Sequence, residues 1–328
     1  MWYQLSGSMA EVSNTTNCDQ TLEITFWVLN LTIGAVTLSG NTIVFAAIVT
    51  NSTLRQYPLN QFLASLAVSD IIMGACVSPT YSLFCLGCLD YPLSKYCRLM
   101  EGPKDIALSS SSLNLLVISC DRYLAVYWPL RYQTIMTSRR VVLLFCLSWW
   151  VSLTVAGIRH LWMHTKQGAE LDQIDSVYNV WLITLFVVIP CIIITIINIK
   201  ITLAIRKQVQ RMQDIALEIA HALNETEANN PDESQVEEIR NRKGTFACVL
   251  VVMVFVVCWI PRVIFNFQYR TKGNLTAVNT LVQKLSMFFL IAQSSVNPFI
   301  YSFCRADFQR AAAKILKCNS HWETCSML

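Results

Sequence analysis

Residues 246–267 read FACVLVVMVFVVCWIPRVIFNF, an apolar run broken only by one charged side chain, Arg262, by Asn266 and by one proline, Pro261. A helix needs about 20 residues to cross the hydrocarbon core of a bilayer, so this run is long enough to span a membrane. Proline lacks a backbone N–H and bends a helix when it lies inside one. The run therefore predicts a membrane-spanning helix with a bend near Pro261.

Six other apolar runs of similar length share the chain with this one. They lie at about Ile24–Val49, Leu59–Phe84, Ile106–Val126, Val141–Ile158, Val177–Ile199 and Leu281–Phe303. Of the 328 residues, 54% are hydrophobic and 14% are charged, which is too apolar for a soluble chain of this length. We predict an all-α fold, a bundle of seven transmembrane helices followed by a short amphipathic cytoplasmic helix. No internal repeat is visible, which disfavours a seven-helix transporter as the alternative.

The distribution of positive charge predicts the orientation of this bundle. Residues 1–23 contain no Lys or Arg, whereas the linkers that hold Arg55 and Arg131 are basic. By the positive-inside rule, the N-terminus is extracellular and the C-terminus cytoplasmic in a multi-pass plasma-membrane protein. The expected parts are an extracellular segment (1–23), a seven-helix domain (24–303) with a cytoplasmic loop at about 206–243, and a cytoplasmic amphipathic helix and tail (304–328).

Four cysteines fall in segments predicted to be extracellular. They are Cys18, Cys85, Cys88 and Cys97. Four cysteines allow three complete pairings, which the sequence does not rank, so we expect one or two extracellular disulfide bonds. Sequons at Asn14 and Asn274 lie on the same side and are expected glycosylation sites. Because no second pair or histidine cluster at ligand spacing accompanies Cys85 and Cys88, no zinc site is predicted.

Polar or helix-breaking residues interrupt the apolar runs, and others mark the helix ends. In chain order they are Gly40-Asn41, Leu66-Ala67-Val68-Ser69-Asp70, Cys97, Asp121-Arg122-Tyr123, Trp149, Pro190, Cys258-Trp259-Ile260-Pro261 and Asn297-Pro298-Phe299-Ile300-Tyr301. Together and in this order, they resemble the rhodopsin-like (class A) G-protein-coupled receptors over nearly the whole chain. The stretch from Asp121 to Tyr132 is most similar to the biogenic-amine receptor branch.

This resemblance implies a cell-surface receptor, not an enzyme, with a heterotrimeric G protein as its partner. The resemblance also implies arrestin and a receptor kinase as partners, and no nucleic acid. In the family, Arg122 contacts the G protein and an apolar side chain at the position of Leu130 docks into it. The alternative for Arg122 is an arginine that only reaches the membrane interface. Asn241 stands where some members carry an acid that holds Arg122, so we expect raised basal activity. For the whole chain, the alternative is a receptor-like scaffold that binds without signalling.

Prolines inside the predicted sixth and seventh helices suggest how such a receptor moves. Pro261 and Pro298 each remove a backbone hydrogen bond and allow a helix to pivot. In the family, the sixth helix swings outward near Pro261 and Tyr301 rotates inward. Phe255 precedes Trp259 by one helical turn and fits the packing relay between ligand site and cytoplasm. An ordinary aromatic core position explains Phe255 equally well.

Asp70 is a lone carboxylate in the middle of the second predicted helix. Such a group either takes up a proton or finds a cation. Together with Ser111, Ser294 and Asn297, it resembles the sodium pocket of the family, and an allosteric Na⁺ is the only ion that the sequence predicts. The alternative is a structural, hydrogen-bonded aspartate. No other cofactor is expected.

The ligand site is expected among the outer halves of the helices. Its expected residues are Lys104, Asp105, Trp259, Arg262, Asn266 and Met287. In amine receptors, an acid 18 residues before the arginine at the position of Arg122 holds the amine, and that position here is Lys104. Asp105 is adjacent, but neighbouring helical residues point about 100° apart. Two cations and one acid favour an acidic small molecule or a peptide over an amine. The alternative is an ion pair of Asp105 with Arg262 or Lys104 that only organises the pocket.

Three further features, each centred on a cysteine, complete the comparison with the family. The segment 159–176, where many members carry the partner of Cys97, contains no cysteine, so Cys97 pairs with Cys18, Cys85 or Cys88 or stays free. Cys318 directly follows the amphipathic helix, where palmitoylation adds an anchor. The last residues, Cys325-Ser326-Met327-Leu328, fit a prenylation box loosely and a ligand of strand-adding PDZ domains.

Overall fold

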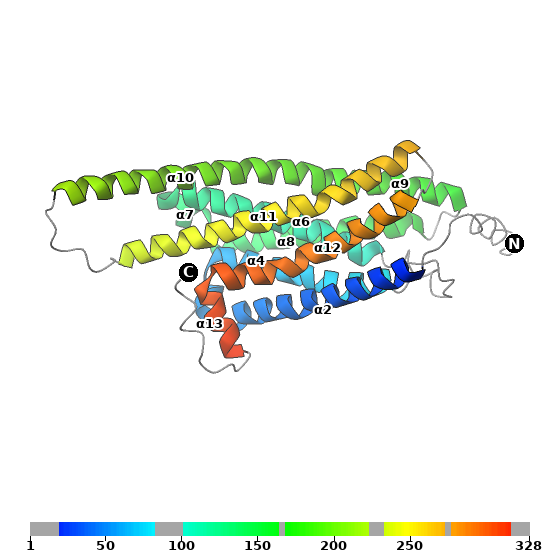
Figure 1. Ribbon diagram of the computed structural model, residues 1–328, viewed down its shortest axis with the longest axis horizontal. Coiled ribbons are helices and arrows are strands. Elements are labelled where there is room, and N and C mark those ends of the chain that lie inside the picture. Colours follow the sequence, from blue (N-terminus) through cyan, green and yellow to red (C-terminus); the bar gives the residue numbers. More distant parts are fainter. Residues whose placement is uncertain (1–19, 83–100, 164–167, 223–232, 273–276, 316–328) are drawn as a thin grey trace.

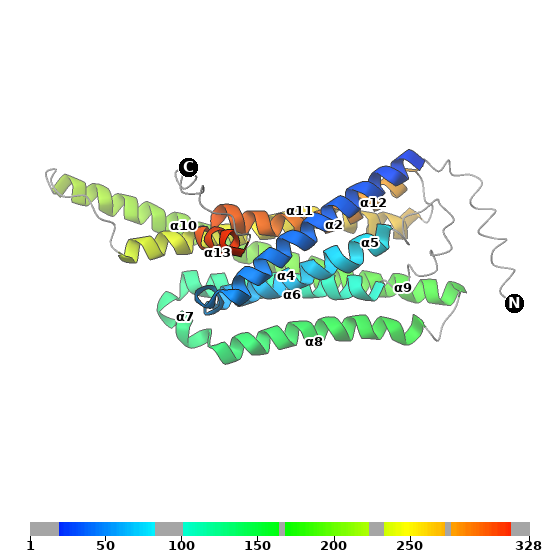
Figure 2. The same cartoon turned by 90° about the horizontal axis from the view of Figure 1, so that it is seen from below.

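The computed structural model describes residues 20–82, 101–163, 168–222, 233–272 and 277–315. Seven long helical segments lie side by side along one axis (Figures 1 and 2). In chain order they are α2 (Gln20–Thr50); α4 (Pro58–Ile72) with the π-helical turn η1 (Met73–Val77) and α5 (Ser78–Thr80); α6 (Glu101–Tyr127); α8 (Ser138–Met163); α9 (Gly168–Ile183) with η5 (Thr184–Val188) and α10 (Ile189–Ala222); α11 (Glu233–Lys272); and α12 (Ala277–Cys304). Three short helices complete the described chain: α3 (Ser52–Arg55), α7 (Pro129–Ile135) and α13 (Ala306–Ile315).

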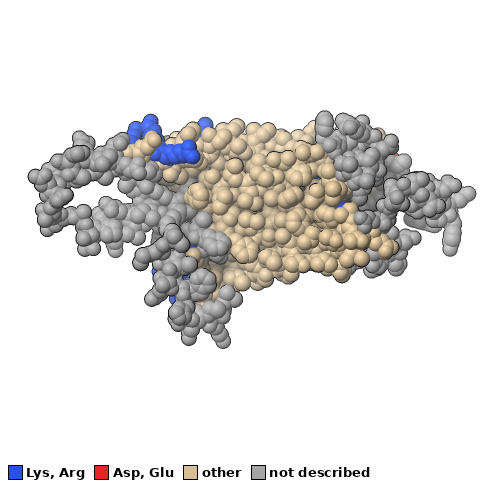
Figure 3. Space-filling model, in the orientation of Figure 1, with Lys and Arg blue, Asp and Glu red and all other residues tan. Residues whose placement is uncertain are grey.

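The surface of the bundle is apolar where a membrane would lie. Five of the described helical segments are long and apolar enough to cross a membrane by length and composition. Figure 3 shows an uncharged band across the middle of one face, with Lys and Arg toward the end from which α10 extends. Large apolar side chains such as Trp150 and Leu161 are 67% and 70% exposed. Side chains of this kind need a lipid environment.

The predicted third and seventh spans, α6 and α12, are not among those five helices, and their buried polar residues explain why. Ser109, Ser110 and Ser112 on α6 are fully buried, and Ser294 on α12 is 1% exposed. α6 packs against α4, α8, α10 and α11, so its polar side chains face other helices and not lipid. A low mean hydropathy therefore marks the central helices of this bundle.

Helix boundaries differ from the apolar runs at several ends. α6 begins at Glu101, five residues before the apolar run at Ile106, so Lys104 and Asp105 are helical. α10 continues to Ala222 and α11 begins at Glu233, so the stretch at about 206–243 contains the extensions of these two helices that its polar composition predicts. Apolar runs report the membrane-embedded part of a helix and miss its polar extensions.

Two π-helical turns each precede a proline by two residues. η1 ends at Val77 before Pro79, and η5 ends at Val188 before Pro190. A proline ring clashes with the carbonyl group four residues earlier in a regular helix, and here that carbonyl lies inside the wider turn. The distortion predicted at Pro190 is thus located in the turn before it.

α2 crosses η1 at short range through small residues. A Cβ atom on Gly74 would lie 2.8 Å from the Gly34 carbonyl oxygen and 2.9 Å from the Leu38 nitrogen. Next to this crossing, Ser78 donates a 2.8 Å hydrogen bond to the Asn30 carbonyl oxygen. Close packing and interhelical hydrogen bonds are the main forces that join helices in lipid, so this crossing positions the second segment against the first.

The predicted amphipathic helix is present as α13, which turns away from the axis of α12 (Figure 1). Phe308 and Ala311 are its buried side chains, and the rings of Phe308 and Tyr301 lie 6.0 Å apart. At its start, Arg305 donates to Asn60 at 2.7 Å and to Asp307 at 2.6 Å. These contacts attach α13 to the end of the bundle where α4 begins and α12 ends.

Candidate ligand site and activation switch

Three side chains form what we call the inner latch at the end of α6: Asp121, Arg122 and Tyr132. Arg122 donates from Nε and Nη2 to Asp121 Oδ2 at 3.0 and 2.6 Å. Tyr132 donates to Asp121 Oδ1 at 2.8 Å and accepts a 3.4 Å hydrogen bond from Arg122 Nη2. Asp121 is fully buried and Arg122 is 8% exposed. Burial and the Asp121 charge raise the pKa of the Tyr132 hydroxyl well above its usual range, so it remains a donor.

The short helix α7 brings Tyr132 to the latch, which the sequence analysis did not foresee. Pro129 stands at the first turn of α7, where its missing N–H leaves no donor unpaired. The next residue, Leu130, is 96% exposed, as a side chain that docks into a partner would be. Tyr123 of the Asp-Arg-Tyr motif instead packs its ring against Tyr127, 4.5 Å between centroids. The side chain of Asn241 lies outside the described residues.

Two aromatic side chains pack against each other one turn apart on α11, and a third is buried on α12. Phe255 and Trp259 on α11 are 3% and 2% exposed, with ring centroids 5.9 Å apart. Tyr301 is 2% exposed near the C-terminal end of α12. Among the described residues, Trp259 Nε1 and Tyr301 Oη have no hydrogen-bond partner. Van der Waals packing, and not side-chain hydrogen bonds, therefore holds Trp259 and Tyr301 in place within the described part of the chain. Pro261 and Pro298 lie inside the same two helices.

Asp70 lies beside a small cavity in the centre of the bundle. Asn297 Nδ2 donates to Asp70 Oδ2 at 2.7 Å. The cavity measures about 10 Å³, and its lining includes Asp70, Ser111, Gln293 and Asn297. Gln293 Oε1 is buried and has no hydrogen-bond partner in the described part of the chain. Ser294 is buried next to this group, and its carbonyl accepts a 2.9 Å hydrogen bond from Asn41. Oxygen donors around a space of this size fit one small cation or one water molecule.

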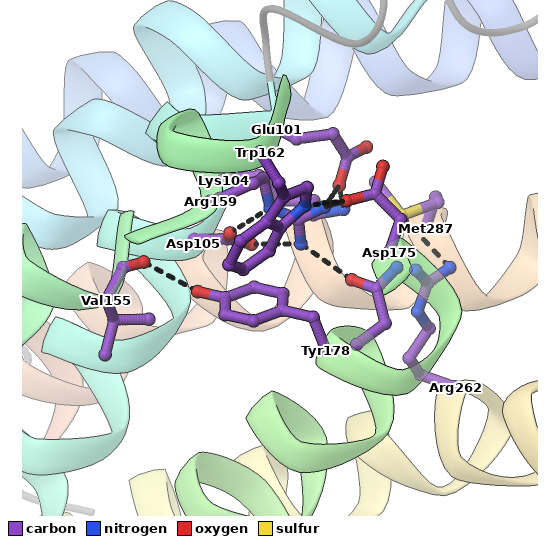
Figure 4. A network of polar contacts seen from close by, with 11 residues as sticks. Glu101, Lys104, Asp105, Val155, Arg159, Trp162, Asp175, Tyr178, Arg262 and Met287 are labelled. Atoms are coloured by element: carbon purple, nitrogen blue, oxygen red, sulfur yellow. Dashed lines mark hydrogen bonds and ion pairs between the residues drawn. The ribbon is translucent and has the colours of Figure 1, made fainter. Parts of the chain in front are cut away.

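At the outer end, a group of charged side chains surrounds Arg159; we call it the outer cluster (Figure 4). Arg159 is 1% exposed and donates to Asp105 at 2.6 Å from Nε and 3.3 Å from Nη2. Nη2 also donates to Asn179 Oδ1 at 2.7 Å. Carboxylate oxygens of Glu101 and Asp175 lie 3.6 Å from Nη1. Arg159 therefore joins α8 to both α6 and α9.

Aromatic side chains enclose the same guanidinium group. Its carbon lies 4.6 Å from the ring centroid of Tyr178, whose hydroxyl donates to the Val155 carbonyl at 2.7 Å. The ring of Trp162 lies 5.0 Å from that of Tyr178, and its Nε1 donates to Asp175 at 2.9 Å. An aromatic face attracts a cation, and the hydrogen bonds fix these rings in place.

The pairing of Asp105 corrects one alternative from the sequence. That alternative was an ion pair of Asp105 with Arg262 or Lys104, but the hydrogen-bonded partner of Asp105 is Arg159, 54 residues away. Lys104 instead pairs with Glu101, one turn earlier on α6. Arg159 lies at the predicted outer end of an apolar run, where the positive-inside rule makes arginine uncommon. This position is the sequence signal that could have indicated an acidic partner within the bundle.

The other expected ligand-site residues lie around this cluster and below it. Arg262 Nη1 lies 3.8 Å from the sulfur of Met287, which is 1% exposed, and Figure 4 shows both beside Asp175. Trp259 lies one turn deeper on the same helix as Arg262. The side chain of Asn266 is outside the described residues. A second buried ion pair, Lys284 with Glu23, connects α12 to α2.

Several expected sites fall on residues that the structure does not describe. They are the cysteines Cys18, Cys85, Cys88 and Cys97, the sequons at Asn14 and Asn274, and the lipidation site Cys318. The disulfide pairing, the glycosylation and the palmitoylation therefore stay predictions.

A bundle of seven long helices with an apolar surface, a latch at its inner end and a polar cluster at its outer end is typical of membrane receptors of the seven-helix class. The family described as 7 transmembrane receptor (rhodopsin family) matches residues 40–301. The chain belongs to this family, which confirms the fold class and the resemblance drawn from its motifs. It is a G-protein-coupled receptor of the cell surface, similar to the biogenic-amine branch.

Similar proteins include histamine and dopamine receptors. The histamine H2 receptor of Cavia porcellus is 28% identical over 317 residues, 91% of this chain and 82% of that protein. The human histamine H2 receptor is 28% identical over 326 residues, 94% and 84% of the two chains. The D(1B) dopamine receptor of Mus musculus is 29% identical over 322 residues, 86% of this chain and 67% of that receptor.

Proposed function

We propose that this receptor responds to an extracellular ligand that carries an acidic group, either a small molecule or a peptide. The observation that supports this ligand class is the bidentate bond between Arg159 and Asp105, which neutralises the acid nearest to the amine-binding position. Lys104 and Arg262 are the cations proposed to receive the ligand. The side chains of Lys104 and Glu101 are 12% and 22% exposed, so this pair lies where an acidic ligand can exchange with Glu101.

An amine is the second candidate, because the similar receptors are named for histamine and dopamine. Their likeness covers most of this chain, and Asp105 is an acid in the right region. However, an amine would have to displace a buried guanidinium held by several bonds. The geometry therefore favours the acidic ligand.

The proposed response is an outward movement of the cytoplasmic half of α11, with Pro261 as its pivot. Trp259 and Phe255 lie between the ligand site and the inner latch and are proposed to transmit the change. Arg122 then leaves Asp121 and contacts the G protein, for which the exposed Leu130 offers an apolar docking contact. The closed latch, with Arg122 buried, supports the interpretation that the structure represents the inactive state.

A sodium ion beside Asp70 is proposed to stabilise that inactive state. Ser111, Asn297 and the unpartnered Gln293 oxygen supply further oxygens. Hard cations prefer such ligands. Arrestin, a receptor kinase and a PDZ protein at the C-terminus are proposed as further partners. We also propose that the chain has no enzyme activity, and that its N-terminus is extracellular and its C-terminus cytoplasmic.

The experiment is G-protein activation in transfected cells with a panel of carboxylates, phosphates, peptides and amines. Arg122→Ala should remove every ligand response while surface expression persists. Arg262→Gln should lower the potency of an acidic hit about tenfold or more, because a charge-assisted hydrogen bond contributes about 1.5–3 kcal/mol. Arg206→Gln, an exposed site on α10, is the matched control. A response to amines alone, unchanged by Arg262→Gln, would overturn the proposed ligand class.

A further inference from the structure

The guanidinium of Arg159 is held in the way in which proteins hold a cationic ligand. It has a bidentate contact to Asp105, a hydrogen bond to the amide of Asn179 and the ring of Tyr178 against its plane. Carboxylate forks and aromatic faces are the usual elements of guanidinium and amine recognition. All of these elements come from α6 and α9, while the cation comes from α8.

Among the described residues, the charges of the outer cluster and the nearby Arg262 balance only while Arg159 is in place. Glu101, Asp105 and Asp175 supply three negative charges, and Lys104 and Arg159 supply two positive charges. Arg262 supplies the third positive charge close by (Figure 4). Without Arg159, Asp105 would have no hydrogen-bonded cation among the described residues, and a buried carboxylate that loses its bonded cation is strongly unfavourable.

The backbone at this position lets α8 come close enough to insert the side chain. A Cβ atom on Gly102 would lie 2.9 Å from Nε2 of His160, the residue next to Arg159. The bare glycine on α6 therefore allows the outer end of α8 to lie against α6. From there, Arg159 reaches Asp105 with its whole side chain buried.

We propose that Arg159 is a tethered cation that fills the cation subsite of this receptor and excludes amine ligands from it. The inference deepens the proposed function, since it names the residue that sets ligand class. The inference also predicts a binding property of the Arg159 subsite that can be measured without a signalling assay. If the side chain of Arg159 is removed, the emptied subsite binds a small guanidinium ion from solution, with Asp105 as its anion.

The test measures thermal unfolding of purified receptor in lipid nanodiscs. Arg159→Ala should lower the unfolding midpoint, and methylguanidinium at millimolar concentration should raise it again in a saturable way. Methylammonium should do the same more weakly, because it cannot form the bidentate contact. Wild-type receptor and Arg206→Ala should show no such rise. In Arg159→Ala combined with Asp105→Asn, methylguanidinium should have no effect.

The outcomes separate this inference from the proposed function. Failure of methylguanidinium to restore Arg159→Ala, or equal restoration of the double variant, would show an ordinary structural ion pair and overturn the inference. If Arg159→Ala does not fold, it is expressed with methylguanidinium in the medium. Recovery of folded receptor is then expected, and the absence of recovery counts against the subsite. Neither result depends on which ligand activates the wild-type receptor.

Discussion

Removing the hydroxyl of Tyr132 should raise basal signalling by loosening the inner latch. The hydroxyl donates to the charged Asp121 at 2.8 Å and accepts from Arg122 at 3.4 Å. A hydrogen bond to a charged group contributes about 1.5–3 kcal/mol, and the lower end suits Tyr132 because it is only half-buried. If the closed state alone contains this bond, Tyr132→Phe shifts the closed-to-open ratio by about 1.5 kcal/mol, or about tenfold.

The assay is ligand-free nucleotide exchange on a G protein by purified receptor at equal concentration. Tyr123→Phe is the matched control, because it deletes the same hydroxyl from a ring that packs on Tyr127 and Trp128 outside the latch. We expect about tenfold faster exchange for Tyr132→Phe, within the uncertainty of such energies, and no change for Tyr123→Phe. Equal rates for Tyr132→Phe and wild type would refute the view that this bond holds the inactive state.

Three further predictions concern the fold and the docking surface. Lys284→Ala should destabilise the receptor by about 3–5 kcal/mol in a thermal unfolding assay, since Glu23 is left charged and buried. The double variant Lys284→Met with Glu23→Gln should lose much less stability, because neither side chain then carries a charge. Equal losses of stability would contradict a buried ion pair between Lys284 and Glu23. Gly74→Leu should abolish folded receptor in size-exclusion profiles, because its side chain meets the backbone of Gly34, and a normal profile would show that the crossing is not tight. Leu130→Ala should reduce ligand-stimulated G-protein activation severalfold without changing ligand affinity; unaltered activation would remove Leu130 from the docking surface.

The bundle could be predicted from the sequence because each membrane-spanning helix is indicated by one continuous stretch of residues. A run such as residues 246–267 is long enough to span a membrane whatever surrounds it, and one motif per helix was sufficient to identify the family. The serines of α6 interrupt its apolar character, but the structure is what shows that they face neighbouring helices. Helix ends were less accessible, because the polar first turn of α6 at Glu101 carries no apolar signal.

The partners of charged side chains were the part that the sequence did not predict. Asp105 and Arg159 lie on different helices, and their meeting depends on how each helix is rotated and how closely α8 approaches Gly102. Tyr132 joins the inner latch only because α7 folds back under α6. Side-chain partners across helices follow from crossing geometry, which hydrophobic periodicity does not encode.

The π-helical turn at Thr184–Val188 also sets the phase of its helix. Leu182 and Pro190 are both buried although eight residues separate them, and in an uninterrupted α-helix they would point about 80° apart. The one residue that the turn adds brings the two back onto the same face. Deleting a single residue there would rotate α9 by about 100° relative to α10, carrying Tyr178 and Asn179 away from Arg159. Deletion of one residue from the π-helical turn would thus separate the contacts of the outer cluster without any substitution in the cluster itself.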